Sequence, residues 1–395
     1  MHAIMHAIIR RHRRAARDTM VLRPLTRLVP PRARALSASV ASSAAAAAIS
    51  VLKPVGAGYA ITLAIALAFQ RKLQYFPAAE HPELHRLPPV YAAVEEHKIT
   101  SADGTACFLW HWPAPEEGTE PEPPRFLGEP ASSLAHPVMS RLRRAHPRLR
   151  DIDVVLFHGN AGNRHHRMYW MHLLREGLGC SVTVVDYRGY GGSAGSPTEE
   201  GLIMDGAAAY SWLKERQRTR PARARTAGRP RPVLWGESIG TGVAVALLAG
   251  EGVGPGQGAS GASGASGASG APPLLVLEAG FTSCVDLGAS AYPWLPVRLG
   301  MLDRFDSQRR AERMRAAGDA GVPLLSLHGE LDEIAPIHFG RALYDAMPAP
   351  RKRWVRLRGT GHNDVPYHDP GKYLTEVAAF LVEEIDKGDS AGPEP

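Results

Sequence analysis

Three residues of this chain could together perform nucleophilic catalysis: Ser238, Asp332 and His362, in that order. A serine hydroxyl is a weak nucleophile until a neighbouring imidazole takes its proton, and a carboxylate can hold that imidazole in the correct tautomer. Ser238 lies in the pentapeptide 236–240, Gly-Glu-Ser-Ile-Gly, between a short apolar run and an all-apolar stretch. At a strand-to-helix turn this pattern exposes the serine hydroxyl. The residues therefore predict attack on an acyl carbonyl through a covalent acyl intermediate.

The same five-residue pattern also occurs at 191–195, around Ser193. A loop separates Ser193 from the strand that we expect to end at Asp186, and Pro197 stands where a helix should already be running. We therefore predict that Ser193 is a loop serine. Residues 189–194 also match a loose dinucleotide-binding pattern. No helix begins inside this pattern, so we do not expect a dinucleotide site there.

The developing negative charge on the substrate oxygen needs hydrogen-bond donors. The run 156–163, Leu-Phe-His-Gly-Asn-Ala-Gly-Asn, follows an expected early central strand. Its backbone N–H groups can point to the same place as the first N–H of the helix after Ser238. We predict that the backbone N–H groups of Asn160 and Ile239 form this oxyanion hole. A plain strand-to-loop turn is the alternative for His158-Gly159.

Other titratable residues compete for the acid and base roles. His328 is a rival base, but it ends an expected strand and should be packed. Glu278, which also ends an expected strand, is the main rival of Asp332 for the orienting acid. Asp364 is so close in sequence to His362 that we expect it to cap the local loop instead.

Apolar runs alternate with helical patterns along most of the chain, which predicts an α/β fold with a mostly parallel central sheet covered by helices on both faces. A hairpin is expected at 94–100 and 105–112. The expected parallel strands are 154–157, 182–185, 232–235, 274–277, 324–327 and 354–357. The expected helices lie near 164–176, 198–215, 239–250, 338–346 and 371–386. With the order serine, acid, histidine, this pattern is typical of the alpha/beta-hydrolase fold.

Biased segments interrupt the expected catalytic domain, which runs over 91–386. Residues 113–150 (Pro-, Glu- and Arg-rich), 217–231 (Arg- and Pro-rich) and 251–272 (a Gly-Ala-Ser repeat) are expected to be surface insertions, and 387–395 a flexible tail. The aromatic and apolar segment 281–301 is expected to form a small lid, with packing in the core as the alternative.

Charge and cysteine content exclude several classes of function. Residues 1–79 hold twelve Lys and Arg but one acid, Asp18, so they carry +11 while the rest of the chain carries −4. A nucleic-acid-binding surface on the catalytic domain is therefore not expected. The three cysteines (Cys107, Cys180 and Cys284) make no disulfide framework and no metal-ligand spacing. We expect no metal, no cofactor and a monomeric chain.

The N-terminal region reads as a basic leader over 1–54 followed by a membrane anchor over 55–72. Residues 55–69 carry no charge but fall short of the roughly 20 needed to cross a bilayer, unless 47–52 also contribute and Lys53 is accommodated. A membrane position is expected, in the endoplasmic reticulum or another endomembrane. A cleaved mitochondrial or plastid transit peptide and a helix packed on the catalytic domain are the alternatives. Ten of the twelve basic residues precede the anchor, which predicts a cytosolic N-terminus.

Several motifs together resemble one family. They are Arg-Lys-Leu-Gln-Tyr-Phe-Pro from Arg71, the run 157–163, Asp-Tyr-Arg-Gly-Tyr-Gly from Asp186, Glu-Glu-Gly-Leu from Glu199, the Ser238 turn and Gly-His-Asn-Asp from Gly361. The chain resembles, over about residues 70–386, the membrane-anchored alpha/beta hydrolases of the bud-emergence type. The alpha/beta-hydrolase-domain-containing protein thirteen type belongs here, within the broader serine-aminopeptidase-like group.

This resemblance implies an N-terminal anchor, a catalytic triad of Ser238, Asp332 and His362, and hydrolase activity. Related groups remove acyl chains from protein thioesters, so an ester or thioester of a lipid or an acylated protein is the expected substrate. An aminopeptidase and a catalytically silent scaffold are the alternatives. The three insertions depart from the family pattern, which affects the expectations for partners and not those for the triad.

Overall fold

The computed structural model describes residues 31–116, 118–119, 125–126, 129–130, 135–220, 230–252 and 272–390. They belong to two compact units. The first ends at Ala64, and the second begins at Ile65 and contains the whole central sheet.

The second unit is built on an eight-stranded sheet with the order β12-β11-β10-β9-β6-β8-β3-β2. The strands are β2 (Glu95–Thr100), β3 (Ala106–Trp112), β6 (Ile152–Phe157), β8 (Ser181–Asp186), β9 (Arg231–Glu237), β10 (Leu274–Glu278), β11 (Leu324–Gly329) and β12 (Lys352–Leu357). All neighbours from β12 to β8 are parallel, whereas β3 is antiparallel to both β8 and β2. The predicted hairpin and the six predicted parallel strands are confirmed. The sheet places the carboxyl ends of its parallel strands at one edge, where α/β folds bind ligands.

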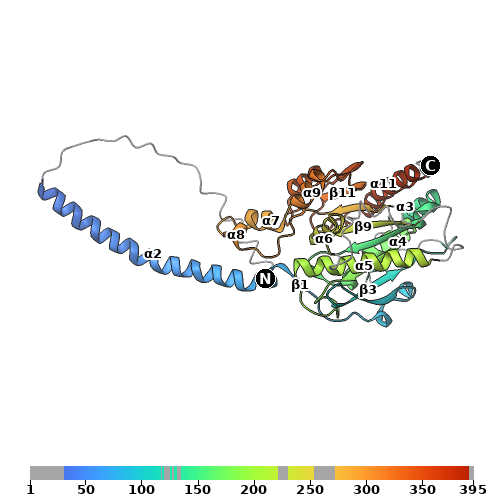
Figure 1. Cartoon of the computed structure of the whole chain (residues 1–395), viewed down its shortest axis with the longest axis horizontal. Helices are drawn as coiled ribbons and strands as arrows, with labels where there is room; N and C mark the ends of the chain where they lie inside the picture. The colour runs from blue at the N-terminus through green and yellow to red at the C-terminus, as the bar shows by residue number, and fades with distance from the viewer. Residues whose placement is uncertain are drawn as a thin grey trace. The chain divides into compact units, whose positions relative to one another are not determined.

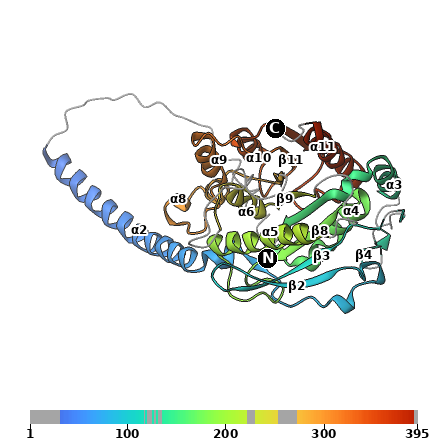
Figure 2. The same cartoon turned by 45° about the vertical axis from the view of Figure 1, so that its right-hand side comes forward.

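Helices cover both faces of this sheet, as predicted (Figures 1 and 2). One apolar core lies under α3 (Ala135–Ala145), α4 (Met168–Leu178) and α11 (Pro370–Ser390). The other lies under α5 (Glu199–Thr219), α6 (Ile239–Leu248), α9 (Ser307–Ala316) and α10 (Ile337–Ala346). Parallel strands buried on both faces are mostly apolar, which is why they are visible in the sequence as nearly continuous apolar runs. Shorter elements are β1 (Phe76–Pro77), β4 (Arg125–Phe126), β5 (Glu129–Pro130), β7 (Ala161–Gly162), η1 (Leu84–Arg86), η2 (Pro89–Tyr91), η3 (Pro147–Asp151), η4 (Arg164–Arg167), α7 (Cys284–Ala291) and α8 (Val297–Gly300).

The predicted insertions differ from the structure at their edges. Residues 113–150 are not all surface: Met139, Leu142 and Leu149 are buried in the first core, and α3 brings the first two there. Their helical spacing is hidden in the sequence by the arginines between them. Helix α5 continues to Thr219, inside the predicted 217–231 insertion, and α11 continues to Ser390, inside the predicted tail. Residues 221–229, 253–271 and 391–395 lie outside the described residues.

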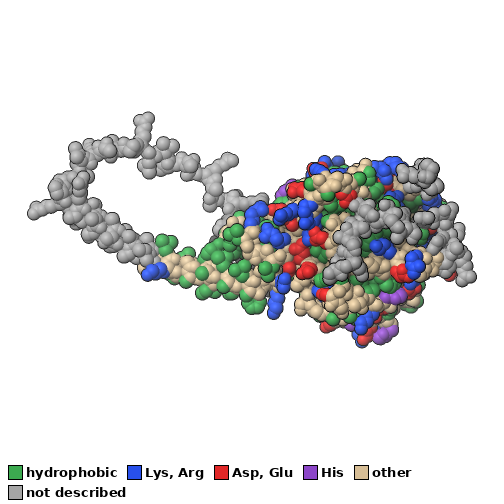
Figure 3. Space-filling model, viewed as in Figure 1, with side chains coloured by type: hydrophobic (Ala, Val, Ile, Leu, Met, Phe, Trp, Pro, Cys, Tyr) green, Lys and Arg blue, Asp and Glu red, His purple; other side chains and the backbone are tan. Residues whose placement is uncertain are grey.

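Helix α2 (Pro31–Gln74) joins part of the predicted leader to the predicted anchor in one element. The helix passes through Pro54, so the predicted boundary between leader and anchor at residues 54 and 55 does not coincide with an interruption of helical structure. Its segment Leu52–Gln74 is long and apolar enough to cross a membrane, and none of it is buried in the fold. Figure 3 shows hydrophobic side chains along this part of α2. Residues 1–30 of the leader lie outside the described residues.

Candidate active site

Ser238 lies at a strained turn between β9 and α6, with φ 52° and ψ −117°. Close packing explains both flanking glycines. A Cβ on Gly236 would lie 2.5 Å from Thr241 Cα, and one on Gly240 would lie 1.9 Å from the carbonyl oxygen of Phe157. Only glycine fits at these two positions, so the pentapeptide encodes the turn that presents the serine.

The structure brings Ser238, Asp332 and His362 together from the ends of β9, β11 and β12. His362 Nε2 is 3.0 Å from Ser238 Oγ, and His362 Nδ1 is 2.7 Å from Asp332 Oδ2. The imidazole therefore bridges the hydroxyl and the carboxylate, which lie 94 residues apart in the chain. This is the geometry that a serine nucleophile needs: a base within reach of its proton and a carboxylate orienting that base.

Asp332 is buried, and each of its oxygens has defined partners. Oδ1 accepts hydrogen bonds from the backbone N–H groups of Ile334 (3.0 Å) and Ala335 (2.7 Å). Oδ2 faces His362 and, at 3.3 Å, Nε2 of His328. Burial opposes ionisation, but the hydrogen bonds from the two histidines and from Ala335 outweigh it and lower the pKa of Asp332 to about 2. Asp332 is therefore a carboxylate throughout the neutral range.

His328, the rival base, is fully buried and does not contact Ser238. Its Nε2 lies 2.8 Å from the carbonyl oxygen of Ala335 and 3.3 Å from Asp332 Oδ2. Since both neighbours are acceptors, Nε2 carries the proton and donates. This supporting role of His328 could not be recognised from the sequence, because its i, i+4 spacing to Asp332 spans a strand end and a loop and forms no recognisable pattern.

The predicted oxyanion-hole residues lie on adjacent segments. Ile239 begins α6, and the contact of Gly240 with Phe157 places this helix start against the end of β6, three residues before Asn160. Within the described residues, neither the Asn160 nor the Ile239 backbone N–H donates to a protein acceptor. Both donors can thus serve a substrate oxygen, and the assignment stays a prediction.

Glu237 was not recognised from the sequence, although it occupies the second position of the pentapeptide. Its carboxylate accepts from the backbone N–H of Gly159 (2.9 Å) and from the Arg167 guanidinium (2.8 and 3.0 Å). Burial raises its pKa, but the Arg167 charge and these hydrogen bonds prevail, so the pKa is lowered. Glu237 therefore ties the Ser238 turn to the loop of Asn160.

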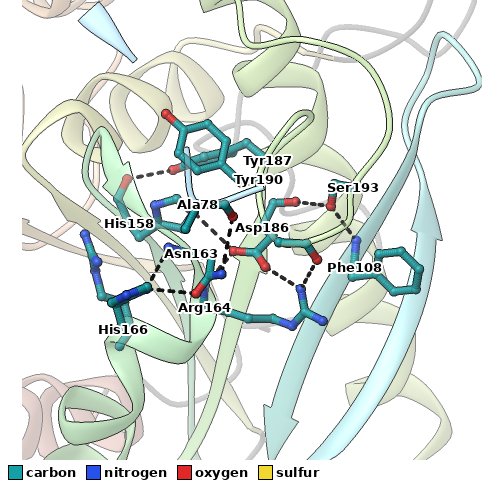
Figure 4. Close-up of polar contacts among 12 residues, drawn as sticks. Ala78, Phe108, His158, Asn163, Arg164, His166, Asp186, Tyr187, Tyr190 and Ser193 are labelled. Carbon is teal, nitrogen blue, oxygen red and sulfur yellow. Dashed lines mark hydrogen bonds and ion pairs between the residues drawn. The ribbon is translucent and has the colours of Figure 1, made fainter. Parts of the chain in front are cut away.

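A buried ionic network supports the other side of this loop (Figure 4). The fully buried Arg164 pairs with Asp186 at the end of β8, and its backbone N–H also donates to Asp186. Arg164 Nη1 donates to the carbonyl oxygen of Gly191 (2.7 Å), and Nη2 to Glu96 (2.6 Å). The loops after β6 and β8 are thus held together by charge-assisted hydrogen bonds.

Arg164→Ala is expected to lower the free energy of unfolding by about 3–5 kcal/mol, because it leaves the Asp186 carboxylate buried without its cation. Urea denaturation measures this. Arg218→Ala, which breaks an exposed pair with Glu215, is the matched control and should leave stability nearly unchanged. Equal effects of the two substitutions would contradict a structural role for the Arg164 network.

The remaining sequence alternatives occupy structural positions. Ser193 Oγ donates to the carbonyl oxygen of Asp186 (2.9 Å) and accepts from the backbone N–H of Phe108 (3.0 Å), so it links two strands. Glu278 accepts from Trp235 Nε1 (3.3 Å) and the Tyr373 hydroxyl (3.0 Å). Burial, then the nearby Glu237 charge, raises the pKa of Glu278 well above its usual value.

The prediction that Asp364 caps its own loop is confirmed. Asp364 caps its own loop by accepting from the backbone N–H of Gly361 (3.0 Å), as expected from its closeness to His362. Cys107 and Cys180 are buried free thiols, and burial raises the pKa of both. Among the described residues, no three His, Cys, Asp or Glu side chains converge as metal ligands would.

Comparison with known proteins identifies the family of this chain. Residues 154–377 match the model of the alpha/beta hydrolase family. The chain belongs to this family. The predicted fold class is therefore confirmed, and family membership supports a hydrolase. An esterase of Pyrococcus furiosus, Pf2001, has a similar fold, with 17% sequence identity and a TM-score of 0.48 over 76% of this chain and 98% of that one.

The relatives also bear out the predicted resemblance. An uncharacterized Mycobacterium tuberculosis protein is 31% identical over 80% of this chain and 88% of its own length. Protein bem46 of Schizosaccharomyces pombe is 30% identical over 58% of this chain and 67% of its own. Lysophosphatidylserine lipase ABHD12 of Danio rerio is 33% identical over 49% of this chain and 46% of its own, so this chain spans about half of that relative.

Proposed function

We propose that this chain is a serine hydrolase that cleaves acyl esters or thioesters of lipid-like substrates through an acyl-enzyme on Ser238. The observation that carries the proposal is the position of His362, hydrogen-bonded to Ser238 on one side and to Asp332 on the other. Asp332, ionised and fully hydrogen-bonded, accepts from Nδ1, which leaves Nε2 free to accept the serine proton.

The reaction follows from this arrangement. Ser238 Oγ attacks the acyl carbonyl while its proton passes to His362 Nε2. The backbone N–H groups of Asn160 and Ile239 stabilise the oxyanion of the tetrahedral intermediate. The imidazolium then gives its proton to the leaving alcohol or thiol, which leaves the acyl chain on Ser238. Water, deprotonated by His362, attacks this ester, releases the acid and restores the serine.

Apolar side chains around the triad favour an acyl chain as substrate. Leu331 and Ile334, which flank Asp332, are 61% and 48% exposed. Phe76 is 50% exposed, and it pairs with Ala161 beside the Asn160 loop. Exposed apolar groups of this kind are typical of surfaces that bind apolar ligands. The relatives named lysophosphatidylserine lipase support a lipid ester in particular.

Substrate assays test this proposal against the aminopeptidase and scaffold alternatives. The full chain is labelled with a fluorophosphonate probe and assayed on p-nitrophenyl esters, acyl thioesters, lysophospholipids and aminoacyl-p-nitroanilides. We expect labelling and hydrolysis of long-chain acyl esters or thioesters. Hydrolysis of the anilides alone would favour a peptidase, and neither labelling nor turnover would favour a scaffold.

We propose that α2 anchors the chain in a membrane through Leu52–Gln74. The support is its length, its mean hydropathy of 1.6 and its lack of burial in the fold. The chain is therefore expected to stay with the membrane pellet after carbonate and after high salt. The basic leader alone could attach it electrostatically, but salt would release that attachment. A soluble mature form that lacks about the first 50 residues would contradict the anchor.

The excess of basic residues before the anchor predicts that the N-terminus is cytosolic and the catalytic domain lies across the membrane. Arg71 and Lys72, after the apolar stretch, oppose this orientation. Protease treatment of sealed microsomes distinguishes the two. The catalytic domain should be degraded only when detergent is present, and its degradation without detergent would reverse the orientation.

A further inference from the structure

The end of α2 is fastened to the segment that follows α8, and both lie in the unit that begins at Ile65. Gln70 accepts from the backbone N–H of Leu302 (2.8 Å) and donates to the carbonyl oxygen of Gly300 (3.3 Å). Arg71 pairs with Asp303 (2.8 Å), and Gln74 donates to the Asp303 carbonyl oxygen (3.0 Å). These polar contacts, on successive turns of α2, fix the position along the helix axis at which residues 300–303 meet the helix.

This position on α2 is where the apolar stretch of the proposed membrane span ends. Leu67 packs so closely on Gly300 that a Cβ there would lie 2.7 Å from Leu67 Cδ2. Leu67 precedes Arg71 by one turn, or about 6 Å along the helix axis. Since Arg71 and Lys72 are the first charges after the apolar stretch, they mark the polar border of the span. Gly300 therefore lies where acyl chains give way to headgroups.

The residues around this contact expose large apolar side chains to solvent. Leu299 is 89% exposed, Leu302 60%, Trp294 56% and Tyr292 36%. We call this set, on the chain from Tyr292 to Leu302, the α8 surface. Leucine exposed to this extent contributes nothing to the folded core, and tryptophan and tyrosine favour the boundary between lipid and water. Arg298 lies in the same segment; its guanidinium pairs with Asp286 (3.0 Å) but stays exposed, so it can also meet lipid phosphates.

We propose that the α8 surface inserts into the interface of the bilayer that α2 spans. The proposal rests on the proposed α2 anchor. Because the α8 surface adjoins that helix, we identify lipid as the partner that covers the surface. The same end of α2 also contacts the catalytic loop. Asn160 Nδ2 donates to the Gln74 carbonyl oxygen, and the Asn160 carbonyl oxygen accepts from the Phe76 N–H, both at 2.9 Å. The membrane surface thus lies beside the active site, and acyl substrates reach Ser238 directly from the bilayer.

A fluorescent label tests the position of the α8 surface. The native cysteines are buried, so Leu299→Cys in the full chain can be labelled selectively with an environment-sensitive dye. After reconstitution into phosphatidylcholine–phosphatidylserine vesicles, we expect blue-shifted emission that is quenched by nitroxide-labelled lipids. Ala379→Cys, exposed on α11, is the matched control and should remain in water. Emission at 299 equal to that at 379 would overturn the proposal, as would a blue shift without lipid quenching, which would indicate a second copy on this surface.

Kinetics give an independent readout. Leu299→Asp with Leu302→Asp should lower hydrolysis of a long-chain ester held in vesicles about tenfold, and leave hydrolysis of soluble p-nitrophenyl acetate unchanged. Equal loss on both substrates, or loss on neither, would contradict the proposal. Failure of the anchor is distinguished by vesicle flotation, and failure of the proposed function by absent probe labelling of Ser238. Each of these can be observed whatever the label at residue 299 reports.

Discussion

Ser238→Ala is expected to lower turnover about 10⁶-fold and to abolish fluorophosphonate labelling. The hydroxyl is the atom that becomes acylated, and the described site places no other nucleophile against His362 Nε2. The fold should survive, because the strain at φ 52° belongs to the backbone turn and alanine adds no atoms to it. Turnover of a p-nitrophenyl ester, gel-based labelling and the melting temperature together measure this.

Ser193→Ala is the control, since it alters the second copy of the same five-residue pattern. It should keep labelling and turnover near those of the unaltered chain. It should lower stability by about 1–3 kcal/mol, because the half-buried N–H of Phe108 loses its acceptor and the buried carbonyl oxygen of Asp186 loses its donor. If the Ser193 variant lost labelling while the Ser238 variant kept it, the assignment of the nucleophile would be wrong.

The fold could be predicted from the sequence because burial on both faces leaves a mark in each strand. Parallel strands buried on both faces carry few polar side chains, so they appear as short apolar runs such as Val154–Phe157 between helical patterns. The Ser238 turn is equally visible, because Phe157 and Thr241 approach it so closely that only glycine fits on either side of the serine. Steric limits at a turn and burial on both faces of a strand restrict which residue types can occur, so both can be recognised in a sequence.

The supporting residues could not be predicted, because their roles depend on contacts between distant segments. Glu237 contacts Gly159 and Arg167, about 70 to 80 residues earlier in the chain. His328 contacts Asp332 only because the loop after β11 turns back on the strand. Helix α3 was missed for a different reason, since its buried residues are interspersed with arginines that suggest a solvated loop. Each of these residues gains its role only when the fold brings its partner near.

The contact between the proposed anchor and the active site also depends on segments that are distant in the sequence. The sequence places the apolar segment and Asn160 in separate functional regions, yet Asn160 donates to the last residue of α2. The loop that carries a proposed oxyanion donor is thus positioned partly by the end of the proposed membrane helix. We infer that removing α2 up to Gln74 to obtain a soluble enzyme would disturb this loop, whereas a cut before Ile65 would leave these contacts in place.

Asp332→Asn is expected to lower kcat roughly 10⁴-fold. The backbone N–H groups of Ile334 and Ala335 both donate to Oδ1, so the amide oxygen of asparagine must take that position. Its NH₂ group then faces His362 Nδ1, where the carboxylate accepted. Nδ1 must accept in turn, which moves the imidazole proton to Nε2. His362 in this tautomer cannot take the Ser238 proton, although the site keeps its shape.

Glu278→Gln is the matched control, because it makes the same change in the rival carboxyl group. Burial and the nearby Glu237 charge raise the pKa of Glu278 well above its usual value, which favours the uncharged form that glutamine resembles. The glutamine amide oxygen can still accept from Trp235 and Tyr373. We therefore expect kcat to change little, and a steady-state assay of both variants on one p-nitrophenyl ester compares them. A large loss of kcat in the Glu278 variant, with little loss in the Asp332 variant, would identify Glu278 at the end of β10 as the orienting acid. The tautomer argument for His362 would then apply to Glu278.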